Sequence, residues 1–145
     1  MRYLYPVKIE HDEDGRFVAT AVDVPEAITD GTTTEEALQE MSDALGAALA
    51  GYSVEGREIP KPSDGAKDTY SVPVAPLVAA KLALRSALQE AGMTNVELAK
   101  QLGISEGAVR RLVDPDHASR LDGVVNALAI LGHTLIIEDQ NQNAA

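Results

Sequence analysis

Cysteine and tryptophan are absent from this 145-residue sequence, and aromatic residues make up only 3% of it. Without cysteine there is neither a disulfide framework nor a thiolate zinc site, so we expect a reducing, cytoplasmic location. The scarcity of aromatic side chains argues against the base-stacking surface that proteins binding single-stranded nucleic acid use. No apolar signal core is present, and no apolar run approaches the length needed to span a bilayer, so we expect no membrane association.

Motifs for catalysis and for cofactor binding are missing as well. The sequence has no Gly-rich phosphate loop and no serine nucleophile motif, and His11, His117 and His133 lie far apart without ligand spacing. Asp23, at the end of an expected strand, has the position of a relic metal-binding carboxylate, but a two-metal hydrolase needs several converging acids. We therefore expect no enzymatic activity, no metal and no cofactor.

What is present is an uneven distribution of charge. The formal net charge of the chain is -11. Residues 1–68 hold 6 Lys and Arg against 15 Asp and Glu, a net charge of -9, whereas residues 76–137 hold 6 of each kind. The acidity thus belongs to the first half, and the two halves are predicted to have different electrostatic roles.

The first half has the pattern of an α+β domain. Apolar residues alternate on either side of the turn former "DEDG", which predicts a β-hairpin. Thr33, with Glu36 three residues on, predicts a capping box at the start of an amphipathic helix. The predicted order is β-β-β-α-β, with strands over residues 3–10, 16–22, 27–29 and 70–74.

The second half reads as helices. Pro76 opens the first of them and Gly92 ends it, and Thr94, Ser105 and Ser119 are plausible N-caps for three more. The short segment "TLIIE" after the last helix has strand character. The predicted domains are 1–68, with a strand at 69–75 that completes it or links it onward, then 76–138, and a disordered tail at 139–145.

The stretch "ELAKQLGISEGAVRRLV", residues 97–113, has the spacing of a helix-turn-helix. Such a unit needs a small residue where its helices cross, supplied by Ala99, and a residue free to adopt a left-handed turn, supplied by Gly103. The apolar positions that hold the second helix are Leu98, Leu102, Ile104, Val109 and Leu112. An ordinary helical pair without a DNA role, whose arginines would be a solvated face, is the alternative.

A helix-turn-helix presents its second helix to the major groove, which assigns roles to individual residues. Base edges are expected to be read by Ser105, Glu106, Gly107, Arg110 and Arg111, where arginine pairs with guanine and Glu106 accepts from cytosine. Thr94, Asn95 and Lys100 are expected to contact phosphates. The expected partner of this half is operator double-stranded DNA.

A neutral module of this kind binds DNA weakly on its own, so we expect duplication. A short apolar strand has no partner within a helical domain, but it can pair with the same strand of a second chain across a two-fold axis. The predicted homodimer, with higher oligomers left open, implies a palindromic operator. The predicted interface residues are Val125, Leu128, Leu135, Ile136 and Ile137.

The sequence resembles the HicB family of antitoxins. The resemblance lies in "YPVKIEHDEDGRFVATAVDVPEAITDGTTTEEALQEMSDAL", then "IPKPS", then the helix-turn-helix, and covers nearly all of residues 3–138. It implies a partial RNase H-like first domain without nuclease activity and a Cro/repressor-like second domain, where some members carry a ribbon-helix-helix. It further implies a small basic partner, a HicA-type toxin that cleaves mRNA.

Attraction of the acidic half to a basic RNA-binding surface agrees with that resemblance. The expected toxin-binding acids are Asp23, Glu26, Asp30, Glu36, Glu40 and Asp43. Two other classes of protein stay open at this point. A free-standing transcriptional regulator with a ligand-sensing first domain would lack a toxin gene beside its own. A residual nuclease would cleave nucleic acid in a metal-dependent way.

Overall fold

The first two strands form the hairpin that the alternating sequence predicts. In the computed structural model, which describes residues 1–141, β1 (Leu4–His11) pairs antiparallel with β2 (Phe17–Ala21). The Asp12 carboxylate accepts the backbone N–H groups of Asp14 and Arg16 at 3.0 and 2.8 Å and so closes the turn. Gly15 takes a positive φ of 79°, which a residue with a side chain rarely adopts.

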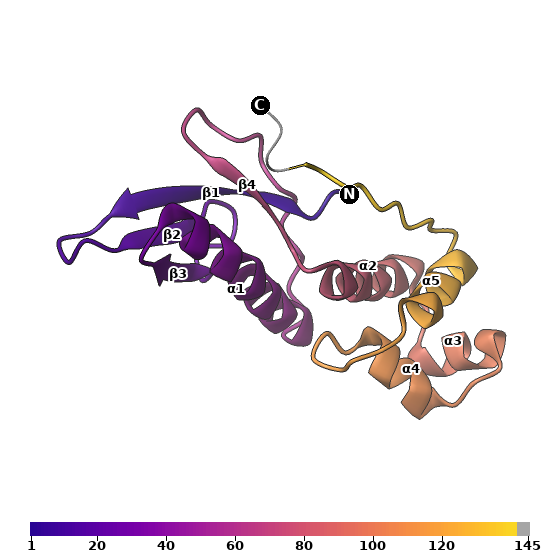
Figure 1. Cartoon of the computed structure of the whole chain (residues 1–145). Helices are drawn as coiled ribbons and strands as arrows, with labels where there is room; N and C mark the ends of the chain where they lie inside the picture. Colours follow the sequence, from indigo (N-terminus) through magenta and orange to yellow (C-terminus); the bar gives the residue numbers. More distant parts are fainter. Residues whose placement is uncertain (142–145) are drawn as a thin grey trace.

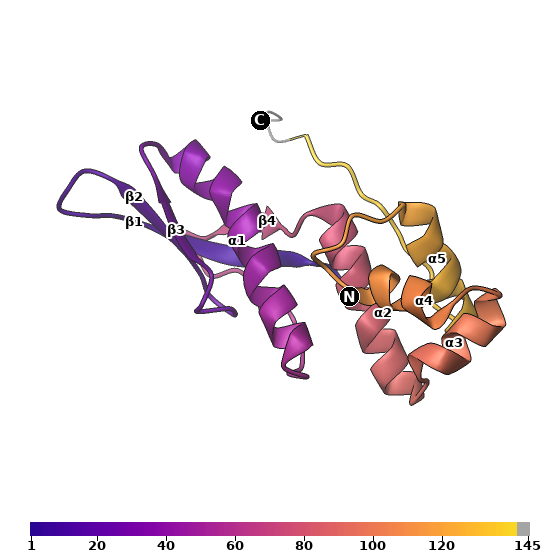
Figure 2. The same ribbon diagram turned by 90° about the horizontal axis from the view of Figure 1, so that it is seen from below.

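A four-stranded antiparallel sheet is built around this hairpin. β3 (Ile28–Gly31) adds to β2, and β4 (Tyr70–Pro73) adds to the far side of β1, which gives the order β3-β2-β1-β4. All four predicted strands are confirmed, with ends shifted by one residue or two at most. Helix α1 (Thr34–Val54) lies across one face of the sheet (Figures 1 and 2).

The predicted capping box of α1 forms only in part. Thr33 Oγ1 accepts the N–H of Glu36 at 3.1 Å, as expected. The Glu36 carboxylate bonds Thr32 instead of the N-cap N–H of Thr33, accepting from the Thr32 N–H at 3.2 Å and from its hydroxyl. Close packing fixes the same corner, because a Cβ on Gly31 would lie 2.6 Å from the Ala37 nitrogen. The start of α1 is therefore tied to the end of β3.

After β4, the described residues form four more helices, which lie to the right of the sheet and α1 in Figure 1. They are α2 (Pro76–Ala91), α3 (Asn95–Leu102), α4 (Glu106–Val113) and α5 (Leu121–Ile130). Thr94 and Ser105 are the N-caps of α3 and α4, as predicted. The prediction for Ser119 is wrong: Arg120 is the N-cap of α5, and the Ser119 hydroxyl is engaged by the ammonium of Lys81 instead.

Two apolar cores stabilise the chain, and α2 contributes to both. The first lies between the sheet and α1 and contains Tyr5, Met41 and Leu45, all fully buried, together with Leu82 from α2. The second lies among the helices and contains Leu84 from the same helix. The first core thus extends past the boundary at residue 75 that the sequence suggests, because Leu82 belongs to it.

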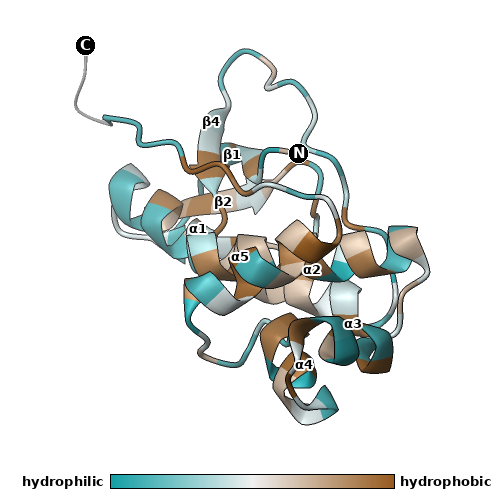
Figure 3. Cartoon of the chain, turned by 90° about the vertical axis from the view of Figure 1, so that its right-hand side faces the viewer, coloured by the Kyte–Doolittle hydropathy of each residue, from teal (hydrophilic) through white to brown (hydrophobic). Residues whose placement is uncertain are grey.

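No regular secondary structure follows α5 within the described residues. Leu135 packs against the second core, whereas Ile136 and Ile137 are 85% and 70% exposed. Figure 3 shows the segment after α5 as a hydrophobic stretch of the ribbon. Glu138 accepts from Arg2 at 2.6 Å, which brings the segment to the start of the chain. The strand predicted at 134–138 is therefore not formed in the single chain; its pairing with a second chain stays a prediction.

The predicted disordered tail, residues 139–145, lies partly outside the described residues, which end at 141. Within the described part, Gln140 donates to the Glu138 carboxylate at 3.4 Å. None of the helices in residues 1–141 is long and apolar enough to cross a membrane.

Candidate DNA-binding and protein-binding surfaces

The helix-turn-helix is formed by α3 and α4 with the turn Gly103–Ser105 between them. Gly103 has φ of 69°, the left-handed conformation that the turn requires. Ala99 is 5% exposed where the two helices meet, and Leu98 and Val109 are fully buried in the second core. These apolar contacts fix α4 against α3 and confirm the predicted helix-turn-helix.

Helix α4 presents the residues predicted to read bases. Ser105 begins it, and its hydroxyl accepts the N–H of Ala108 at 3.1 Å. Arg110 and Arg111 are both exposed in the last turn. Arg110 is paired with Glu106 one turn earlier, and the hydrogen bond that Arg110 donates to Glu106, together with the negative charge of Glu106, raises the pKa of Arg110. No described carboxylate pairs with Arg111, so its guanidinium is available to a ligand.

Gly107 lies between those side chains, on the first turn of α4. A Cβ built on it would lie 3.7 Å from Nη1 of Arg111, so the arginine side chain runs back over this glycine toward the start of the helix. A small residue at this position leaves the Arg111 guanidinium near the N-terminal end of α4, which is the end that helix-turn-helix proteins of known binding mode place in the major groove.

The residues predicted to contact phosphates lie on α3. Thr94 and Glu97 form a complete capping box, in which Thr94 Oγ1 accepts from Glu97 N at 3.1 Å and Glu97 accepts from Thr94 N at 3.2 Å. Asn95 opens the helix, and Lys100 is exposed. The Thr94 hydroxyl is therefore engaged within the chain.

A groove of about 630 Å³ runs beside the start of α3, and one of its lining residues was not identified from the sequence. Arg85 of α2 lines it together with Thr94, Asn95 and Arg110. Arg85 is partly buried and has no carboxylate partner among the described residues. In the sequence of α2, Arg85 is one cation on an amphipathic helix. Only the packing of α2 against α4 and the tight turn from α2 into α3 place it beside the predicted phosphate contacts.

Lys81 is the second residue that sequence reasoning missed. It lies on α2 and is fully buried, and its ammonium donates to the carbonyls of Arg111 and Asp114, both at 2.9 Å. It also donates to the His117 carbonyl and to the Ser119 hydroxyl, the latter at 2.8 Å. Burial lowers the pKa of Lys81, and the nearby charge of Asp114 partly opposes this shift.

Two of the predicted toxin-binding acids are engaged by the end of α1 and the segment that follows it. Asp23 accepts from the N–H and the hydroxyl of Ser63, at 2.9 and 3.1 Å. Glu26 accepts from the Tyr52 hydroxyl, and Arg57 lies 3.7 Å away. The Tyr52 hydrogen bond is the main reason that the pKa of Glu26 is lowered.

Two more acids are engaged at the opposite end of α1. Asp30 pairs with Arg16 at 2.8 Å, and this hydrogen bond lowers the pKa of the carboxyl group. Glu36 accepts from Thr32, which lowers the pKa of Glu36 as well. Both carboxylates are thus held in the charged form, and a partner would have to compete with these internal donors.

Glu40 and Asp43 differ from the other four acids, because no hydrogen bond or ion pair in the described chain engages them. Both are exposed on α1, three residues apart and therefore on one face. Asp43 also lines a cleft of about 210 Å³ between α1 and the loop after α4, where Pro115 and Asp116 face it. Of the six predicted toxin-binding acids, the two that are free of internal partners thus lie on this face of α1.

The predicted dimer-interface residues fall into two groups. Leu128 is only 2% exposed within the second core, so its side chain is not available at the surface. Val125 and Leu135 are partly buried, and Ile136 and Ile137 are exposed. If a second chain binds here, the C-terminal segment contributes most of the apolar surface.

Within residues 1–141, no group of three or more His, Asp or Glu side chains is close enough to hold a metal ion. Asp23, the relic carboxylate considered above, faces the Ser63 donors rather than other acids.

Comparison with known proteins matches both halves of the chain. Residues 4–83 match the family described as the HicB_like antitoxin of bacterial toxin-antitoxin system. Residues 82–115 match a winged helix-turn-helix DNA-binding family. This second match runs from α2 to the loop after α4, and no strand follows α4 in the described chain, so the described unit has no wing.

Curated relatives agree over nearly the whole length. Antitoxin HicB 2 of Photorhabdus laumondii is 40% identical over 131 residues, which is 90% of this chain and 92% of that one. Antitoxin HicB of Escherichia coli (strain K12) is 34% identical over 90% of this chain and 95% of its own. Antitoxin HicB of Pseudomonas fluorescens (strain Pf0-1) is 37% identical over 88% of each chain. The chain therefore belongs to the HicB-like antitoxin family, with a DNA-binding helix-turn-helix in its second half.

Proposed function

We propose that the chain neutralises a small, basic HicA-type toxin that cleaves mRNA, and that it represses its own operon by binding operator DNA. The first half, residues 1–68 with the strand that follows, is the toxin-binding part, and the second half is the DNA-binding part. The relatives are named antitoxins, which supports the first role. The chain itself is proposed to be an inhibitor and regulator rather than an enzyme.

The observation that carries the proposal is the division of charge between two surfaces. The half with net charge -9 presents the unpaired carboxylates of Glu40 and Asp43 on one exposed face of α1. The neutral half presents the unpaired guanidinium of Arg111 on α4. A basic toxin and an anionic duplex are attracted to opposite halves, so that one chain can bind both.

We further propose that the DNA-bound form is a homodimer that pairs through the C-terminal segment. Ile136 and Ile137 expose apolar surface on a segment whose backbone has no ladder partner in the single chain. Pairing across a two-fold axis would bury these side chains and place two copies of α4 about one turn of DNA apart.

The toxin-binding role is tested by reversing charge on α1 in the full-length chain. Glu40→Lys with Asp43→Lys is expected to slow association with the protein encoded by the neighbouring reading frame and to weaken rescue of growth when that protein is expressed. Association by the unchanged chain should slow as salt rises, while dissociation changes little, because steering between charges is screened.

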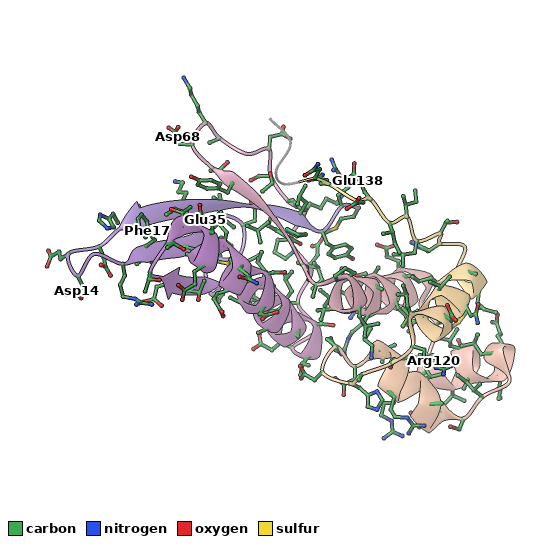
Figure 4. All side chains as sticks on the ribbon, in the orientation of Figure 1. Asp14, Phe17, Glu35, Asp68, Arg120 and Glu138 are labelled. Atoms are coloured by element: carbon green, nitrogen blue, oxygen red, sulfur yellow. The ribbon has the colours of Figure 1, made fainter. Side chains whose placement is uncertain are left out.

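The matched control is Glu13→Lys with Asp14→Lys, at the tip of the β1–β2 hairpin, where Asp14 points away from the rest of the molecule (Figure 4). It makes the same change of net charge far from α1 and should leave rescue intact. Equal effects of the two pairs would reduce the role of α1 to net charge alone. If the neighbouring frame encodes no toxin, a free-standing regulator with a ligand-sensing first domain becomes the better hypothesis.

A further inference from the structure

Helix α4 ends differently from the two helices before it. α2 ends at Gly92 and α3 at Gly103, both left-handed, with backbone N–H groups that turn back to bond the last carbonyls. The C-cap of α4 is Asp114, with φ of -82° and ψ of 111°, an extended conformation that supplies no such turn. The last carbonyls of α4 therefore need donors from elsewhere in the chain.

Lys81 supplies those donors from α2. Its ammonium reaches the Arg111 carbonyl in the last turn of α4, the Asp114 carbonyl at the C-cap, and the His117 carbonyl in the following loop. The Ser119 hydroxyl, 2.8 Å away, is a fourth acceptor for three N–H groups, so it shares a donor with one of the carbonyls. A positive charge at the carboxyl end of a helix also opposes the negative end of the helix dipole. The Lys81 side chain thus caps α4 and also binds the loop that follows it.

We propose that Lys81 is a positioning residue for base reading, one that fixes where α4 lies when the chain binds DNA. This inference rests on the proposed DNA-binding function. Lys81 touches no base itself, because it is fully buried. It acts through Arg111, whose backbone carbonyl it binds at 2.9 Å and whose side chain is the unpaired cation on α4. Lys81 thus binds the backbone of the same residue whose side chain is proposed to read bases.

The chemistry of the site favours lysine over other residues. A compact ammonium with three donors can satisfy carbonyls that converge from three directions, whereas the guanidinium of arginine is a planar fork. Methionine has about the same length and would fill the space, but it would remove the ammonium from all three carbonyls. The Asp114 carbonyl would keep the His117 N–H at 3.1 Å and the Arg111 carbonyl only the Ser119 hydroxyl at 3.4 Å. The free end of α4 would then be able to shift, and contacts to base edges depend on placement within about 0.5 Å.

The test compares specific with non-specific DNA binding by the full-length chain. The specific probe is a duplex selected by the unchanged chain from a random-sequence library; the non-specific probe is a scrambled duplex of equal length and composition. Lys81→Met should weaken binding to the selected duplex about tenfold, the equivalent of one good base contact, while binding to the scrambled duplex changes less than about twofold. The matched control is Lys8→Met, an exposed lysine on β1, which should leave the ratio unchanged.

The ratio separates positioning from a merely structural role. If Lys81 only stabilised the fold, the variant would lose folded protein, and both duplexes would be bound less by the same factor, which overturns the proposal. Where Lys81→Met fails to fold, Ser119→Ala removes the hydroxyl that accepts from Lys81 at 2.8 Å and donates to the Arg111 carbonyl at 3.4 Å. It should lower the ratio in the same direction by about two- to threefold; no change there overturns the proposal too. An unchanged chain that selects no sequence refutes the DNA-binding function itself, whereas selection with an unaltered ratio in Lys81→Met refutes only this inference.

Discussion

Arg111→Ala should weaken operator binding more than Arg110→Ala, although the two arginines are neighbours on α4. Arg111 has no carboxylate partner in the described chain, while Arg110 is held by Glu106. Arg110 must leave that ion pair before it can contact a base, so part of the energy of its new contact is offset by the contact that it gives up. Arg111 gives up only contacts with water.

The magnitude follows from the kind of contact. A bidentate arginine–guanine pair contributes about 1 to 3 kcal/mol of discrimination, which is about a 5- to 150-fold change in Kd. Loss of Arg111 should fall within this range on the operator and should be much smaller on a scrambled duplex. If Arg111 instead contacts only phosphate, both duplexes lose affinity alike and the slope of log K against log salt falls by about one.

Glu106→Gln provides the complementary change on the same face of α4. It removes a carboxylate from the side facing the duplex and releases Arg110, so affinity for a scrambled duplex should rise. If Glu106 accepts from a cytosine amino group, as its position predicts, operator affinity should not rise to the same extent, and the specificity ratio should fall.

Fluorescence anisotropy with both duplexes over a salt series is the assay, with circular dichroism to check the fold. Arg120→Ala is the control, because Arg120 carries the same charge and is exposed, but it precedes α5 instead of lying on α4 (Figure 4). Operator binding by Arg111→Ala within twofold of the unchanged chain would refute the assignment of α4 as the helix that reads bases. So would an equal loss in the Arg120 control.

Two further predictions concern the C-terminal segment and the acidic half. Deleting everything after Gly132 should convert a dimer into a monomer by light scattering and severely weaken operator binding; Ile137→Asp should do so more mildly, and a truncated chain that stays dimeric would place the interface elsewhere. Arg16→Ala should raise the pKa of Asp30 in an NMR titration, because the hydrogen bond that lowers it is lost, and leave Glu26 unchanged. The Arg16–Asp30 pair stabilises the fold above the unfolded pKa of Asp30, and this stabilisation is lost as pH falls through the lowered folded pKa. The variant lacks the pair, so its free energy of unfolding should not show this loss at acid pH. An Asp30 pKa that does not change in the variant would contradict the pairing.

Local patterns in the sequence predicted most of the fold. Alternation located the strands, and the N-caps Thr94 and Ser105 located the two helices of the helix-turn-helix, because each signal is complete within a few residues. Ser119 has the same chemistry as those caps, yet it does not cap α5. Its hydroxyl is taken by Lys81, which is 38 residues earlier in the chain, and no local rule can anticipate that competition.

The candidate site was predicted less completely, for the same reason. The residues on α3 and α4 follow from the motif, but Arg85 acquires a role only when the fold brings α2, the start of α3 and the end of α4 around one groove. For the acids, exposure and charge could be predicted from the sequence, but their pairing with internal donors could not. Asp23 and Asp30 were equivalent to Asp43 until the fold placed Ser63 and Arg16 beside the first two.

Because α2 contributes side chains to both cores, its length determines both the distance and the rotation between the sheet and the DNA-binding half. Leu82 faces the first core and Leu84 the second, and each residue of a helix turns the chain by about 100°. Inserting one residue between them would swing the DNA-binding half around the axis of α2 relative to the sheet, with every side chain otherwise intact. A toxin bound to α1 would therefore have a fixed orientation relative to the operator, as it would not have with a flexible linker. The length of α2 would determine which side of the DNA double helix the toxin faces.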